Sequence, residues 1–166
     1  MSLSAAANDE GTNAPMSDYI RAIETVLNTS GFAVLATEGN GQPHTSLIAI
    51  TPFGNLRQII FATYRNTLKY QNLSRNNKVA VFIEGGYFNT KGLKDNVFLT
   101  IIGHTEEIII AGNEAAYLAH LKRHPEMEAF MASPDCVLIR VIAQSYQVVY
   151  GIDDVKWITA EELESI

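Results

Sequence analysis

The sequence predicts one mainly β domain with short helices, an antiparallel β-barrel of the α+β class. About seven short apolar runs are bounded by turn residues, and three amphipathic segments interrupt them. Consecutive runs are joined mainly by short turns, which implies antiparallel pairing rather than strand–helix alternation. Many short strands in a small chain suit a barrel or a sandwich. A barrel is favoured because closure leaves no sheet edge exposed.

The first half of the chain supplies a tail, a helix and three strands. Residues 1–15 are small, polar and aperiodic, which predicts a disordered tail before a single domain of residues 16–166. Ser17 is expected to cap a helix, because isoleucine and leucine follow it at helical spacing. Asn40-Gly41 between two apolar runs is a strong hairpin signal. The strands are expected at residues 32–37, 44–51 and 59–63.

The second half continues with helices and further strands. Gly103 lies inside a long apolar run and indicates a bend or a bulge, so that run is one bent strand or two. The loop 85–96 either borders the substrate side of a cofactor or is an idle hairpin connection. Helices are expected at residues 67–75 and 113–125, with a further turn at 126–132. Strands are expected at residues 79–83, 97–110, 137–142 and 146–150.

Composition excludes several classes of protein. Lys plus Arg is 12 and Asp plus Glu is 18, and the net charge of −6 argues against a nucleic-acid partner. The single cysteine, Cys136, excludes an internal disulfide and any multi-cysteine metal site, and is interpreted as a buried small hydrophobe. No apolar run approaches the roughly 20 residues of a membrane helix. A cytoplasmic protein with no membrane partner is expected.

Residues 59–76 contain the candidate ligand-binding residues. A buried strand ends at Thr63, a polar turn holds Arg65, and a helix begins at Thr67 with Lys69 in its first turn. A helix start offers free N–H groups and the positive end of the helix dipole, and a hydroxyl with two cations makes this a phosphate site. Cations oppose the dipole there, so an anion between them explains their presence. The alternative is an ordinary capped helix with solvated charges, and the local sequence alone favours it because such short patterns are frequent.

This segment and its flanks resemble the FMN-binding split-barrel superfamily, the pyridoxamine 5′-phosphate oxidase-like proteins. The resemblance covers about residues 17–150, most of the chain. Its sharpest part is an aromatic–x–Thr strand end, followed by hydroxyl–x–Lys and a leucine four residues later: Phe61, Thr63, Thr67, Lys69 and Leu73. The resemblance implies a split β-barrel with flanking short helices, built as a homodimer with FMN between the subunits.

The resemblance also implies which residues hold the cofactor. The hydroxyl of Thr67 and the amine of Lys69 match the phosphate-binding pair, and Thr63 matches the strand-end hydroxyl near the phosphate or the ribityl chain. The oxidase has an arginine where this chain has Leu68, and Arg65 is the candidate to replace that charge. The strand beside the isoalloxazine is matched by Ser46, Leu47 and Ile48.

The implied activity is that of an FMN-dependent oxidoreductase, which transfers hydride or electrons between an unidentified donor and a small molecule. The C-terminal Arg-Leu signature of the oxidase itself is absent, because the chain ends WITAEELESI. A family member with a different reaction is therefore expected. No side chain is assigned as a catalytic acid or base, and no metal site is expected.

Three alternatives stay open. One is a haem-binding or haem-degrading protein of the same fold, and another is a module that binds or senses FMN without turnover. The third is a deazaflavin protein, whose basic groove would be formed by Arg57, Arg65, Lys69, Arg75 and Lys78.

The histidines and the C-terminal aromatics have simpler interpretations. His44 is interpreted as a surface residue of a strand edge, although His44 or one of the helical histidines is also the candidate axial ligand of the haem alternative. His120 and His124 share a helix face but no glutamate accompanies them in a metal-binding pattern, so they are expected on the surface. Tyr150 and Trp157 are expected to pack the barrel end, or alternatively to cover the flavin of the partner subunit.

Overall fold

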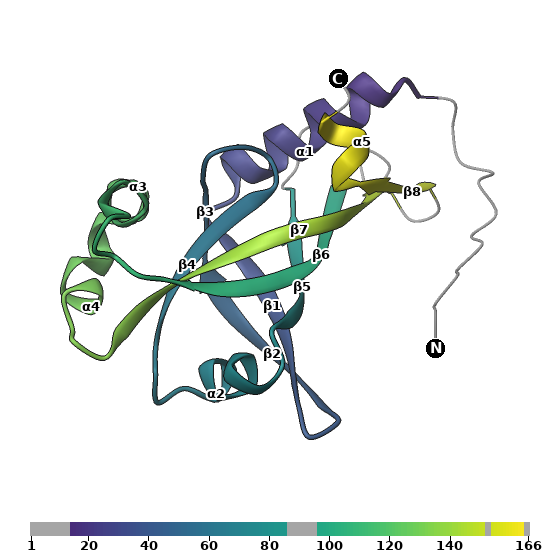
Figure 1. Cartoon of the computed structure of the whole chain (residues 1–166). Coiled ribbons are helices and arrows are strands. Elements are labelled where there is room, and N and C mark those ends of the chain that lie inside the picture. Colours follow the sequence, from purple (N-terminus) through teal and green to yellow (C-terminus); the bar gives the residue numbers. More distant parts are fainter. Residues whose placement is uncertain (1–13, 86–95, 152–153, 165–166) are drawn as a thin grey trace.

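The computed structural model describes residues 14–85, 96–151 and 154–164, and every statement below concerns these. Residues 1–13 of the predicted tail and residues 86–95 of the predicted loop 85–96 lie outside the described residues. Figure 1 shows a strongly curled antiparallel sheet with short helices around it. This half-barrel confirms the predicted α+β split barrel.

The strands are β1 (Phe32–Gly39), β2 (Gln42–Ala49), β3 (Thr51–Pro52), β4 (Gln58–Tyr64), β5 (Lys78–Glu84), β6 (Val97–Ile108), β7 (Cys136–Tyr150) and β8 (Asp154–Thr159). The helices are α1 (Met16–Thr29), α2 (Leu68–Arg75), α3 (Glu114–Arg123), the 3-10 turn η2 (Pro125–Met127), α4 (Glu128–Met131) and α5 (Ala160–Glu164). In Figure 1, α1 and α2 lie at opposite ends of the curled sheet, and α3 and α4 lie to one side of it.

The sheet order is β2-β1-β5-β6-β7-β4-β3, and β8 pairs with β7. All these pairs are antiparallel, as predicted. The long strand β7 is shared, because its first half pairs with β4 and its second half with β8 while β6 runs along its length. No ladder joins β2 to β3 or β4 among the described strands. The closure by hydrogen bonds that favoured a barrel is therefore not found, and β2 is an edge strand.

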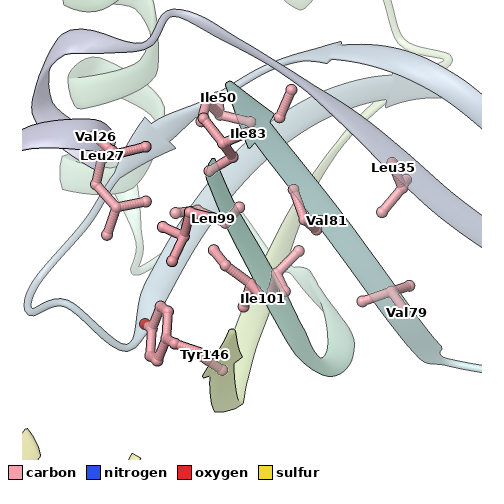
Figure 2. Close-up of a cluster of buried hydrophobic side chains, with 14 of the residues drawn as sticks. Val26, Leu27, Leu35, Ile50, Val79, Val81, Ile83, Leu99, Ile101 and Tyr146 are labelled. Atoms are coloured by element: carbon pink, nitrogen blue, oxygen red, sulfur yellow. The ribbon is translucent and has the colours of Figure 1, made fainter. Parts of the chain in front are cut away.

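The core lies on the concave side of the sheet. Helix α1 buries Tyr19, Ile23, Val26 and Leu27 there, and Figure 2 shows Val26 and Leu27 beside inward side chains of the sheet strands. Strand β4 is buried on both faces, since its other face meets α3 and α4 in a second apolar cluster. Burial on both faces explains why its sequence is a continuous apolar run rather than an alternating one.

Several element boundaries differ from the sequence prediction. The two strands predicted at 137–142 and 146–150 are one strand, because the register shift opposite Ile102 and Gly103 adds a bulge residue, Gln144. That extra residue interrupts the alternation that a sequence pattern relies on. Strand β8 and helix α5 were not predicted. The cap at Ser17 is wrong, because α1 begins at Met16 after Pro15 and has no side-chain cap.

The surface positions predicted for two histidines are also wrong. His120 is 0% exposed, and its Nδ1 lies 2.8 Å from the Thr51 hydroxyl. His124 is buried as well, and its Nε2–H donates to the Ile50 carbonyl at 2.9 Å. Both contacts hold α3 and its end against the corner between β2 and β3. Trp157, expected to pack the barrel end, is instead 46% exposed on β8, whereas Tyr150 packs against Tyr19 of α1.

Candidate cofactor site

The candidate site begins where β4 ends and α2 starts. Residues 64–67 form a tight turn, in which the backbone N–H of Thr67 donates to the Tyr64 carbonyl at 3.2 Å. The Thr67 hydroxyl donates to the same carbonyl at 2.8 Å and accepts from the N–H of Tyr70 at 3.4 Å. Thr67 is thus the N-cap of α2, as predicted. The cap orients the first turn of the helix and the remaining N–H groups at its start.

The structure brings two of the predicted site hydroxyls together. Thr63 is 2% exposed at the end of β4, and its Oγ1 lies 3.1 Å from Oγ1 of Thr67. Because the Thr67 hydroxyl donates to Tyr64, the Thr63 hydroxyl donates in this pair. The strand end and the helix start therefore share a short chain of hydroxyl groups.

Lys69 occupies the first turn of α2 and is half-buried. Partial burial lowers the pKa of its ammonium group below the ordinary value. Among the described residues, no carboxylate forms an ion pair with it. A partly desolvated cation beside a capped helix start favours an anionic ligand, because an opposite charge would restore the interaction lost with water.

Arg65 is engaged elsewhere. Its guanidinium forms an ion pair with Oε1 of Glu107 on β6 at 2.5 Å and lies 5.9 Å from the ring centre of Tyr70. The Tyr70 hydroxyl donates to Oε2 of the same glutamate at 2.9 Å. The sequence pointed to Arg65 as a phosphate ligand, whereas in the structure both oxygens of Glu107 hold Arg65 and Tyr70. Sequence reasoning missed Glu107, which lies about 40 residues away and carries no local signal.

The remaining predicted residues lie on β2, the edge strand. Ile48 is buried toward the core, and Leu47 is 69% exposed on the opposite face. Ser46 shares the inward side with Ile48, and its Oγ is buried without a hydrogen-bond partner. Backbone groups on the outer edge of β2 are not used by any ladder among the described strands. An orphaned hydroxyl and a free strand edge are both suited to the polar rim of a planar ring.

His44 is a second orphaned group on β2. Its Nδ1 is buried and has no hydrogen-bond partner, and the ring is half-buried rather than on the surface as predicted. The signal was available in the sequence, because His44, Ser46 and Ile48 alternate on one face of a strand. Across the ladder, His44 faces Thr37, whose hydroxyl accepts from the buried Asn72 amide of α2 at 3.1 Å. The inward face of β2 therefore lies at the level of α2.

A hollow of about 590 Å³ lies on the outer face of β1. Exposed apolar side chains line much of it, and three of them share one row of the sheet, because Val34 pairs with Leu47 on one side and with Phe82 on the other. Phe32 adds an aromatic ring and Glu84 a carboxylate. The hollow is thus apolar with a polar rim, and Leu47 places it next to the predicted ring-binding strand.

Other candidate chemistry is weak in the described part of the chain. No cluster of three or more His, Cys, Asp or Glu side chains there is arranged to hold a metal ion. Cys136 is half-buried, and burial raises the pKa of its thiol, which disfavours a thiolate nucleophile. None of the described helices combines the length and apolar character that a membrane crossing requires.

Comparison with known proteins places the chain in a family. The sequence profile described as pyridoxamine 5′-phosphate oxidase matches residues 20–150. The chain belongs to the pyridoxamine 5′-phosphate oxidase family. The match spans most of the first helix, the capped start of α2 and strands β1 to β7. The predicted family membership is confirmed. A comparison with curated proteins found no match.

Solved structures show the same fold at low sequence identity. A haem-binding protein from Mycobacterium smegmatis is 17% identical with a TM-score of 0.79, over 93% of this chain and 62% of that one. A Clostridium acetobutylicum protein related to general stress protein 26 is 16% identical with a TM-score of 0.68, over 90% and 99%. An FAD-binding protein from Mesorhizobium loti is 14% identical with a TM-score of 0.61, over 77% and 89%. These likenesses establish the fold alone.

Proposed function

We propose that the protein binds FMN and acts in the cytoplasm as an FMN-dependent oxidoreductase on a small molecule. One observation carries the proposal: Lys69 is half-buried in the first turn of α2, without a carboxylate partner among the described residues, next to the linked hydroxyls of Thr63 and Thr67. A lysine, a hydroxyl and a helix start are the groups that bind a terminal phosphate. The family match supports FMN as the phosphate-bearing ligand.

The residues at the site fit FMN at its phosphate end and at its ring end. Lys69, Thr67 and the free N–H groups of α2 would hold the phosphate, with Thr63 at the strand end. Ser46, Leu47 and Ile48 would lie along the ring, and the orphaned Ser46 Oγ would gain a partner there. When bound, the flavin supplies hydride or electron transfer. The protein orients the ring and shapes one face for the substrate.

The homodimer is part of the same proposal. Leu47, Val34 and Phe82 expose 69%, 37% and 43% of their surface in one row across three strands. Such a contiguous apolar face on a sheet is a surface that a second copy can cover. The face adjoins the ring-binding strand, so a dimer would enclose the cofactor between subunits.

The dimer is tested with Phe82→Asp, which places a charge in this row. We expect a monomer by sedimentation and weaker FMN binding. Leu118→Asp is the matched control, because Leu118 is 61% exposed on α3, away from the row. A Phe82→Asp protein that stays dimeric would place the interface elsewhere.

The flavin itself is tested by titration with FMN and riboflavin, followed by turnover with a nicotinamide donor and an electron acceptor. Tighter binding of FMN than of riboflavin supports the phosphate site. Binding without turnover would leave a module that binds or senses FMN. No binding of either flavin contradicts the proposal.

Haem is the second candidate, and His44 favours it. Its Nδ1 is unpartnered, and the residue is only partly buried on the edge strand β2. His120 also has an unpartnered ring nitrogen, Nε2, but His120 and His124 are 0% and 4% exposed and are held in the core through their other ring contacts. A structural neighbour described as haem-binding shares the fold. A visible spectrum of the protein mixed with haem decides this, because an axial imidazole shifts the haem band and His44→Ala would remove the shift.

A further inference from the structure

Glu107 holds the side chain of Arg65, the second cation near the start of α2. Arg65 follows β4 directly, and its backbone N–H donates to the Asp135 carbonyl at 3.1 Å, which fixes the base of the side chain. The guanidinium is 2.5 Å from Glu107 and lies against the ring of Tyr70, a residue of the first turns of α2. The guanidinium therefore lies beside a side chain that belongs to the first turn of α2.

The start of α2 is within reach of this side chain. Arg65 precedes the cap Thr67 by two residues, and the tight turn holds the two residues together. Because Arg65 is so close to the cap in sequence, a change of rotamer can turn its guanidinium from Glu107 toward an anion at the capped helix start. Glu107 and that anion are then competitors for one cation.

We propose that Glu107 withholds Arg65 from the phosphate and so sets a moderate affinity that lets FMN exchange. This rests on the proposed function, because it concerns the affinity of the same site. Glu107 accepts from Arg65 through one oxygen and from Tyr70 through the other, so the carboxylate is fixed in place. Among the described side chains at the start of α2, only Lys69 is then a cation that no carboxylate shares and that the phosphate can use.

The Arg65–Glu107 ion pair is exposed, so breaking it costs little. The side chains of Arg65 and Glu107 are 48% and 38% exposed, and solvent weakens such pairs. A phosphate dianion can therefore draw Arg65 away from Glu107, and the small cost of breaking the pair is subtracted from the affinity for FMN. Glu107 acts through Arg65 and is a residue that tunes affinity, not a ligand of the cofactor.

The test is the dissociation constant of FMN for Glu107→Gln, measured by flavin fluorescence, with riboflavin as the ligand that lacks phosphate. We expect Glu107→Gln to bind FMN about twofold to fivefold more tightly than the parent does, with riboflavin binding unchanged. Glu106→Gln is the matched control, because it removes the same charge one residue away without touching Arg65. Arg65→Ala added to Glu107→Gln should abolish the gain.

Each other result overturns the inference. Unchanged or weaker FMN binding by Glu107→Gln would mean that Glu107 only steadies the turn. An equal gain in Glu106→Gln would mean that bulk charge, not Arg65, is responsible. A gain that survives Arg65→Ala would exclude Arg65 as the mediator. If the parent protein binds neither flavin, the proposed function is refuted as well. The measurement on the parent alone separates that outcome from the three above.

Discussion

Lys69→Ala is the most informative perturbation of the candidate site. The substitution removes one charge-assisted hydrogen bond to a phosphate dianion, worth about 1.5–3 kcal/mol. Lys69 is half-buried and has no competing carboxylate partner in the described structure, so little of this should be lost to another contact. FMN affinity should therefore fall by about tenfold to a hundredfold.

The assay is a fluorescence titration with FMN and with riboflavin at two salt concentrations. Riboflavin affinity should stay constant, and the loss for FMN should shrink at high salt. Lys78→Ala is the control, because Lys78 is exposed at the start of β5 beyond the far end of α2. Equal losses for both flavins, or no loss for either, would refute the assignment of this segment to the phosphate.

Three further predictions concern stability. Thr67→Ala should lower the unfolding free energy by about 1 kcal/mol through loss of the cap, whereas Thr67→Ser should retain it, as urea titration would show. Gly39→Ala should cost about 1–3 kcal/mol, because the new Cβ would lie 2.2 Å from the Oδ1 of buried Asn72, and an unchanged urea midpoint would contradict this.

Burial lowers the pKa of His120 to about 4 from an ordinary 6.5, so the unfolded chain binds more protons between these values. Stability is then full above pH 6.5 and falls by about 3 kcal/mol toward pH 4, and His120→Phe should flatten the lower end of that profile.

Short sequence patterns predicted the turns and the helix cap, because these features depend on neighbouring residues. Asn40 takes a positive φ of 54° and Gly41 one of 80°, as the hairpin between β1 and β2 requires. The cap at Thr67 was likewise predicted, because it depends on residues close in sequence, and Gly103 marked the position of the register shift between β6 and β7.

The side-chain positions that the sequence did not predict depend on contacts between residues far apart in the chain. The buried positions of His120 and His124 depend on the corner between β2 and β3, about 70 residues earlier in the chain. The engagement of Arg65 depends on Glu107, 42 residues later. A single sequence carries no period or spacing that links such partners. Polarity therefore placed the two histidines on the surface, and closeness to the helix start pointed Arg65 to the phosphate.

The most direct test of FMN binding is the visible absorption spectrum of the protein after incubation with FMN and desalting, followed by identification of what heat releases. The account predicts the two broad bands of a bound flavin and release of FMN, about one per chain. A sharp haem band in the protein as purified, or a colourless protein after desalting that also fails to quench FMN fluorescence, would contradict it.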